Sequence, residues 1–167
     1  TAIIAAATGK DVAGLTGRGT GVDDKGLAKK IQVLEQSLAL NKPAPRDGLD
    51  ILCKVGGFEI AGIAGCALAA AARKRAVMLD GIISTAGGLI AWLLNPAVKD
   101  YLFVGHKSVE KGQAAACELM GLSPILDLHM RLGEGTGAAI AIDVAEAACK
   151  IMCEMASFES AGVSNKE

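Results

Sequence analysis

Three short apolar segments alternate with helical patterns in the second half of the chain, and this alternation is the feature that most limits the possible folds. The segments AVMLDG, YLFVGHKS and SPILDLHMRLGEG occupy 76–81, 101–108 and 123–135, and each leads into a segment of helical character. Strands that are joined by helices through short connections pair in parallel and cross over in the right-handed sense. The sequence therefore predicts an α/β fold in which helices flank a parallel sheet.

Helical patterns account for most of the remaining chain. The apolar stretches 60–72 and 82–94 are rich in glycine and alanine, and both are shorter than the ~20 residues that span a bilayer. We expect both to form buried helices and not membrane spans. Further helices are predicted at 1–7, 25–40, 49–54, 108–121 and from about 136 to 158, with a frayed tail after Gly162.

The composition narrows the classes of partner. Seventeen basic and 18 acidic residues give a formal net charge of -1, which supplies no large field to attract nucleic acid or an anionic membrane. With 51% hydrophobic but only 3% aromatic residues, the core must be built from Ala, Ile, Leu and Val. We therefore expect small or neutral partners.

The cysteines show neither a disulfide pattern nor a metal-binding pattern. Their number is odd, and they lie in apolar segments without a C-x-x-C pair or a nearby group of histidines. Cys149 and Cys153 share one helix face, but two thiols are too few for a metal site. We expect reduced, buried thiols of a cytoplasmic protein, and no metal, at the five positions Cys53, Cys66, Cys117, Cys149 and Cys153.

Polar residues follow each predicted strand. Asp80 ends the first, the segment 106–108 ends the second, and the segment 131–134 follows the third. In open parallel sheets, ligands bind at the carboxyl ends of the strands. We therefore expect these three segments to meet in one crevice.

Glu134 is the most conspicuous acid in these segments, because it stands between two glycines directly before the last helical segment. A Gly-Glu-Gly sequence leaves open backbone on both sides of one carboxylate, which suits a reactive group that needs room for a ligand. An acid that interacts with the helix dipole is the alternative.

The first half of the chain contains a glycine-rich loop at 14–26, whose backbone N–H groups are suited to approach an anion. Lys30 lies on the helix that follows the loop. A plain flexible loop and a solvated helix lysine are the alternatives.

Five motifs resemble, in order and spacing, the nicotinate-nucleotide:dimethylbenzimidazole phosphoribosyltransferases of cobamide biosynthesis. They are GRGTGVDD, LALNKPAPRDGLDILCKVGGFEIAGIAG, VMLDGIIS, GHKSVEKG and MRLGEGTGAA. The resemblance covers nearly the whole chain but only about the C-terminal half of that family's length. It implies that residues 1–167 form the C-terminal portion of the α/β domain, that the helix at about 136–158 belongs partly to a small helical domain, and that a GIGNTT-type phosphate loop lies upstream.

The resemblance also implies a Rossmann-like parallel sheet that is incomplete at its N-terminal side, a homodimeric assembly, and no metal or redox cofactor. The implied reaction transfers 5-phosphoribose from nicotinate mononucleotide to dimethylbenzimidazole, which releases nicotinate and yields α-ribazole phosphate. Two alternatives to this active enzyme stay open. The chain is either an inactive or structural half of such an enzyme, or it is part of a paralogue that uses another aromatic base.

Residue roles follow from the same resemblance. Glu134 matches the family's general base, and Lys30 matches a lysine that holds the substrate phosphate. Asp80 at a strand end is suited to bind the ribose hydroxyls or to stabilise the electron-poor ribosyl carbon, and a helix cap is the alternative. Ser108 is suited either to contact substrate or to cap the next helix. Leu132 packs on the aromatic ring or in the core, and His106 is assigned no catalytic role. The remaining candidates are Gly17, Gly19 and Thr20 for the phosphate, and Gly81 and Gly133 for the substrate.

Overall fold

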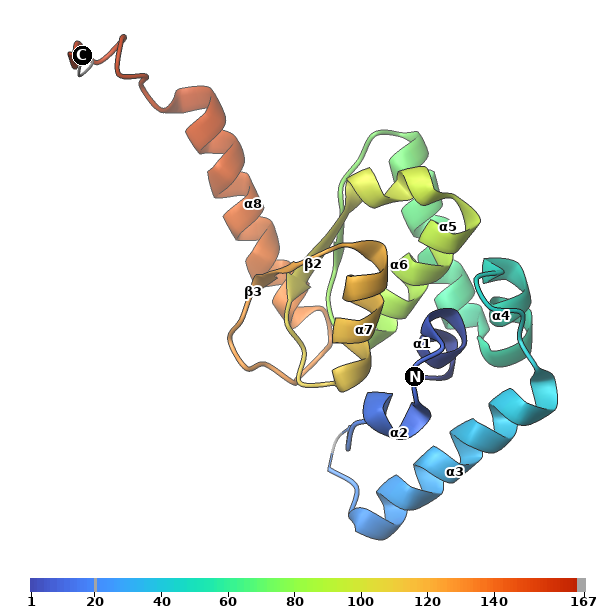
Figure 1. The fold of residues 1–167 in the computed structure, drawn as a ribbon. Helices are drawn as coiled ribbons and strands as arrows, with labels where there is room; N and C mark the ends of the chain where they lie inside the picture. The colour runs from blue at the N-terminus through green and yellow to red at the C-terminus, as the bar shows by residue number, and fades with distance from the viewer. Residues whose placement is uncertain (20, 165–167) are drawn as a thin grey trace.

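The computed structural model describes residues 1–19 and 21–164, which form a three-stranded parallel sheet with helices on both faces (Figure 1). The strands are β1 (Val77–Leu79), β2 (Leu102–His106) and β3 (Pro124–Leu126), in the order β1-β2-β3. Val77 pairs with Leu102, and His106 pairs with Leu126. The predicted α/β fold with a parallel sheet is confirmed.

Helices connect the strands and cover them. Helix α6 (Ile82–Leu94) and the 3₁₀ helix η1 (Pro96–Tyr101) join β1 to β2, and α7 (Lys111–Met120) joins β2 to β3. The long helix α8 (Thr136–Glu154) contacts all three strands. Figure 1 shows α8 on one side of the sheet and α6 and α7 on the other.

The N-terminal part of the chain is helical and packs against α6 and α7. Its helices are α1 (Ala2–Thr8), α2 (Val12–Leu15), α3 (Asp24–Asn41), α4 (Gly48–Val55) and α5 (Phe58–Ala72). Asp11, Asp23 and Asp47 begin α2, α3 and α4 by accepting a backbone N–H with their side chains, which satisfies a donor that the helix itself leaves free. No described helix combines the length and the hydropathy that a membrane crossing requires.

Aliphatic side chains form the core between the sheet and these helices, as the composition requires. Ile4, Ile51, Leu79, Leu89 and Ile90 are among the largest fully buried side chains. The prediction that 82–94 is a buried helix is confirmed for the middle of α6, which is buried without interruption from Thr85 to Ala91, whereas Ile83 and Leu94 are exposed. For 60–72 the prediction is right for one face only.

Helix α5 buries Ala64 and Ala67 but leaves Phe58 94% exposed. Its apolar residues lie all round the helix, whereas the described part of the chain covers one side of it. The opposite face of α5 is therefore an exposed apolar surface.

The prediction of buried cysteines is wrong for four of the five. All are free, and only Cys117 is buried, in α7, where burial raises the pKa of its thiol to about 11. The exposed thiols lie on faces of α4, α5 and α8 that no described residue covers, namely at Cys53, Cys66, Cys149 and Cys153.

The last helix is shorter than predicted. It ends at Glu154 because Met155 adopts an extended backbone conformation with φ -70° and ψ 132°. Ser157 then begins a turn, in which its carbonyl accepts the N–H of Ala161 at 2.9 Å. The outer half of α8 lies beyond the sheet, and Met152 there is 86% exposed (Figure 1).

Two glycines let the start of α8 approach the end of β2. A Cβ atom at Gly105 would lie 3.0 Å from the Cα atom of Ala138, and a Cβ atom at Gly137 would overlap the imidazole of His106. Side chains at either position would separate the strand from the helix. The two glycines therefore allow the helix start to lie directly on the sheet.

Gly137→Ala should destabilise the chain by about 1–3 kcal/mol, because the added methyl group must displace a buried ring or the helix start. A matched control is Gly62→Ala in α5, where a Cβ atom meets no described atom within 4 Å. That change should stabilise by ~0.5–1 kcal/mol, since alanine loses less backbone entropy than glycine in a helix. Urea unfolding measures both, and equal effects would contradict the close approach.

Candidate functional site

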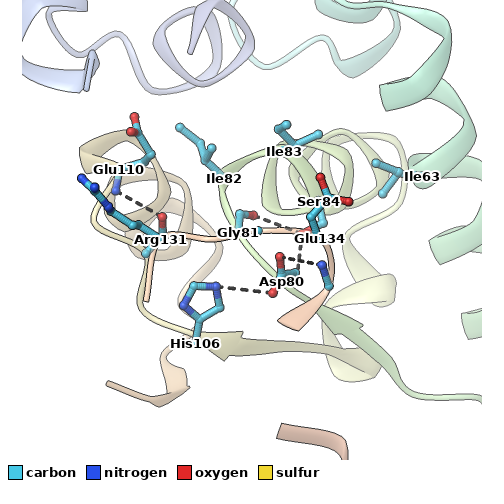
Figure 2. A pocket seen from close by; sticks show the side chains of 13 residues that line it. Ile63, Asp80, Gly81, Ile82, Ile83, Ser84, His106, Glu110, Arg131 and Glu134 are labelled. Atoms are coloured by element: carbon cyan, nitrogen blue, oxygen red, sulfur yellow. Dashed lines mark hydrogen bonds and ion pairs between the residues drawn. The ribbon is translucent and has the colours of Figure 1, made fainter. Parts of the chain in front are cut away.

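A cavity of about 410 Å³ lies at the carboxyl ends of the strands (Figure 2). Asp80 and Gly81 after β1, His106 and Ser108 at the end of β2, and the loop from Arg131 to Gly135 all contribute to its lining. The prediction that three separate segments meet in one crevice is confirmed. Apolar side chains from α5 and α6, namely Ile63, Ile82 and Ile83, form another part of the wall, to which Ser84 and Glu110 also contribute.

The Glu134 loop has an uncommon backbone. Gly133, Glu134 and Gly135 adopt φ values of 77°, 56° and 78°, so three successive residues are left-handed. Glycine adopts this conformation readily, whereas a residue with a Cβ atom is disfavoured by ~1–2 kcal/mol. Glu134 therefore occupies a position where a glycine would be less strained. Its side chain is exposed and lines the cavity.

Asp80 holds this loop in place through the first turn of α8. Its Oδ1 accepts the N–H groups of Gly137 at 2.8 Å and Ala138 at 3.1 Å, and its Oδ2 accepts that of Gly135 at 3.3 Å. The N-cap residue of α8 is Gly135, which has no side chain to do this. Asp80 therefore caps α8 from the end of a distant strand, and its role toward the substrate stays a prediction.

The backbone of Asp80 is fixed as well. Its N–H donates to Ser84 Oγ at 2.8 Å, and its carbonyl accepts from Gln113 Nε2 at 3.1 Å. Gln113 is 1% exposed, also donates to the carbonyl of His106, and accepts the N–H of Ser108 at 2.6 Å. One amide thus joins the ends of β1 and β2.

Sequence reasoning missed Gln113, although a signal exists. Gln113 shares a helix face with Ala116, Cys117 and Met120, all of which are buried. A polar residue at helical spacing among apolar ones must find hydrogen-bond partners inside the protein. Glu110 at the cavity was also missed, and nothing in its local sequence distinguishes it from a solvated acid.

His106 is buried at the end of β2, with 2% of its surface exposed. Its Nε2 lies 3.4 Å from Asp80 Oδ1, and its Nδ1 lies 3.3 Å from the carbonyl oxygen of Lys107. Among residues 1–19 and 21–164, Nε2 has no hydrogen-bond partner. Nε2 and Asp80 Oδ1 are in contact, but they do not form a hydrogen bond.

The glycine-rich loop lies beside the cavity and reaches it through Glu110. Gly19 donates its N–H to Glu110 Oε1 at 3.0 Å, and Lys30 Nζ donates to the carbonyl of Gly17 at 3.1 Å. Thr20 lies outside the described residues. Leu132 is 73% exposed and does not pack in the core, and it is not among the residues that line the cavity.

Comparison with known proteins assigns the family. Residues 1–163 match the model of a family described as phosphoribosyltransferase. The chain belongs to this family. It is 59% identical, over 99% of its length, to the nicotinate-nucleotide--dimethylbenzimidazole phosphoribosyltransferase of Roseiflexus sp. (strain RS-1), and 57% identical, over the same share, to that of Chloroflexus aggregans.

A solved structure gives the same assignment. The crystal structure of CobT from Thermus thermophilus matches 99% of this chain with a TM-score of 0.92 at 42% identity. The chain spans about half of these relatives, 47% of each of the two sequences and 49% of the solved chain. The resemblance seen in the sequence motifs is therefore confirmed. Within the part of the chain that the structure describes, no three His, Cys, Asp or Glu side chains are grouped as metal ligands.

The left-handed backbone at Glu134 predicts how substitutions there change the free energy of unfolding. Glu134→Gly should be more stable than Glu134→Ala by about 1 kcal/mol, because alanine keeps the Cβ penalty that glycine avoids. At Glu35, an exposed position inside α3, the same pair of substitutions should give the opposite order by ~1 kcal/mol. Urea unfolding of the four variants measures both differences, and the same order at both positions would contradict the loop geometry.

Proposed function

We propose that the intact protein transfers 5-phosphoribose from nicotinate mononucleotide to dimethylbenzimidazole, which releases nicotinate and forms α-ribazole phosphate for the lower nucleotide loop of cobalamin. The names of the relatives at 59% and 57% identity support these substrates. The observation in this chain that carries the proposal is the exposed carboxylate of Glu134, which a left-handed loop presents at the cavity.

The chemistry requires one such carboxylate. One ring nitrogen of the benzimidazole attacks the anomeric carbon while the bond from that carbon to nicotinate breaks. The other ring nitrogen carries a proton, so the product ring would be positively charged. Glu134 accepts this proton, and the ring becomes neutral. The apolar wall from α5 and α6 suits a flat aromatic base.

The phosphate of the nucleotide is assigned to Lys30 together with Gly17, Gly19 and Thr20. Two contacts support this assignment. The Gly19 N–H already binds an anionic oxygen, that of Glu110, and the Lys30 ammonium lies at the same loop. Backbone N–H groups and an ammonium are both suited to a phosphate.

The remaining cavity residues complete the proposed substrate site. Asp80, Gly81 and Ser108 are assigned to the ribose, and Gly133 is assigned to the base. The support is that all four line the cavity. Leu132 is next to Glu134 and is free to pack on the aromatic ring. We also propose that the intact protein is a cytoplasmic homodimer and that part of α8 belongs to a small helical domain. The proposed reaction uses no metal or redox cofactor.

Glu134→Gln in the intact protein should lower turnover by roughly 10²-fold or more, the usual loss for a general base. The amide keeps the shape of the side chain but cannot accept the proton. Glu146→Gln is the matched control, since Glu146 is exposed on α8, and its turnover should stay at the wild-type value. Wild-type kinetics in Glu134→Gln would remove Glu134 from the mechanism.

Lys30→Ala should weaken the binding of nicotinate mononucleotide by ~1.5–3 kcal/mol, the contribution of a charge-assisted hydrogen bond. Lys29→Ala changes the same charge one residue away, at an exposed position of α3, and should leave the dissociation constant nearly unchanged. Calorimetry measures both. An equal, small effect of the two substitutions would assign Lys30 to the solvated face of the helix.

A second candidate is that this chain alone is a structural half without turnover. The exposed apolar surface supports it, since Phe58 on α5 and Met152 on α8 are 94% and 86% exposed, and β1 is an edge of the described sheet. Such surface favours association.

We expect the isolated 167-residue chain to self-associate and to be inactive, and addition of the part of the relatives that it does not span to restore nucleotide binding. Light scattering and a binding titration of the two purified pieces test this. A monodisperse monomer that converts nicotinate mononucleotide unaided would reject the structural candidate. Turnover of the intact protein with adenine or a phenol, but not with dimethylbenzimidazole, would replace the proposed base.

A further inference from the structure

His106 is the buried polar side chain of the site whose placement the proposed chemistry leaves unexplained. It is 2% exposed, and its imidazole lies against the backbone of Gly137 in the first turn of α8. Burial of an imidazole without complete hydrogen bonding is unfavourable. The position of the ring therefore needs a reason other than filling space, since an apolar side chain would fill the same space at a lower cost.

The ring contacts the carboxylate of Asp80. Nε2 lies 3.4 Å from Oδ1, the oxygen that also accepts the N–H groups of Gly137 and Ala138. A carboxylate oxygen has two lone pairs, and these two donors occupy them. Because both lone pairs are occupied, Nε2 of His106 lies 3.4 Å from Oδ1, which is longer than a usual hydrogen bond. His106 is thus a third group beside Oδ1, and its ring limits where this oxygen can lie.

The position of the Asp80 carboxylate determines the position of Glu134. Oδ2 accepts the N–H of Gly135, the residue that follows Glu134, and Oδ1 accepts the next two free N–H groups of the helix start. A shift of the carboxylate would therefore move the backbone that carries Glu134. Figure 2 shows His106, Asp80 and Glu134 together at the cavity, with dashed lines from Asp80 to the ring and to the loop.

The conformation of Glu134 also needs such support. A non-glycine residue in the left-handed region persists only where surrounding contacts fix it. The side chain of Glu134 is exposed, so its own packing does not fix the backbone. The support must come from the hydrogen bonds around it. The N–H of Thr136 donates to the carbonyl of Gly133 at 3.0 Å, and the N–H groups of Gly135 and Gly137 donate to Asp80.

We propose that His106 is a positioning residue for Glu134, which acts by fixing the Asp80 carboxylate and the first turn of α8. The proposal rests on the proposed function for the role of Glu134, but the positioning itself is a property of this chain. His106 touches neither the base nor the proton in this scheme. Its contribution lies in the geometry of the loop.

The test compares His106→Phe, which keeps a flat ring of similar size without nitrogen, with His106→Gln, which keeps a polar group and is a second variant should the phenylalanine impair folding. The first readout is amide hydrogen exchange without substrate. In His106→Phe, exchange at Gly135, Gly137 and Ala138 should rise by about tenfold or more, since it reports local opening. The control is the amide of Gly121, which donates to Glu118 at the end of α7 and should be unchanged.

The second readout is steady-state kinetics of the intact protein. Because a small misplacement of a catalytic group mainly affects the chemical step, kcat of His106→Phe should fall by about tenfold or more, with KM for nicotinate mononucleotide unchanged. His106→Gln should restore part of kcat and part of the exchange protection.

The outcomes separate the two proposals. Unchanged exchange at the three amides, or an equal rise at Gly121, would overturn the positioning role, the second because it would show a general loss of stability. A wild-type protein without turnover would instead reject the proposed function, and the exchange result alone would then decide whether His106 fixes the loop.

Discussion

The carboxylate of Asp80 at the start of α8 is the interaction on which the rest of the site depends. The first N–H groups of a helix lack partners within it, and the N-cap of α8 is a glycine without a side chain. A carboxylate from the end of β1 supplies the acceptor and carries the negative charge that a helix N-terminus favours. The hydrogen-bond partners of Asp80 lie between 55 and 58 positions after it in the chain.

The close approach of backbone to backbone makes this connection possible. Gly105 and Gly137 bring the end of β2 and the start of α8 together, and Gln113 holds the ends of β1 and β2 in register. Asp80 can then reach the helix while its own backbone is fixed. The Glu134 loop is thus determined from three elements, which is why a left-handed residue is stable there.

The sequence predicts much of this fold because its strands and helices carry local signals. Asp80, Ser108 and Glu134 are visible as polar residues that follow apolar segments, and the rule for parallel sheets predicts that they meet at one edge, where the cavity lies. The family motifs then assign roles. These predictions depend only on patterns in the residues around each position.

What the sequence does not predict depends on contacts between distant residues. Nothing near Asp80 reveals that its oxygens accept the N–H groups of Gly137 and Ala138, and a lone histidine at a strand end does not reveal its burial beside them. The cysteine prediction was wrong for a related reason. An apolar surrounding sequence indicates burial only where another element covers that helix face, and the described residues leave Cys66 and Cys149 exposed.

The most direct test of this account is amide hydrogen exchange at Gly137 and Ala138 in Asp80→Ala, with Asp127→Ala as the control, because Asp127 pairs with Lys107 at the surface. A charge-assisted hydrogen bond contributes ~1.5–3 kcal/mol, so loss of the cap should accelerate exchange at these amides by about 10- to 100-fold. The control should leave both rates at the wild-type value. Unchanged exchange in Asp80→Ala would show that the start of α8, and with it the Glu134 loop, is held by something other than Asp80.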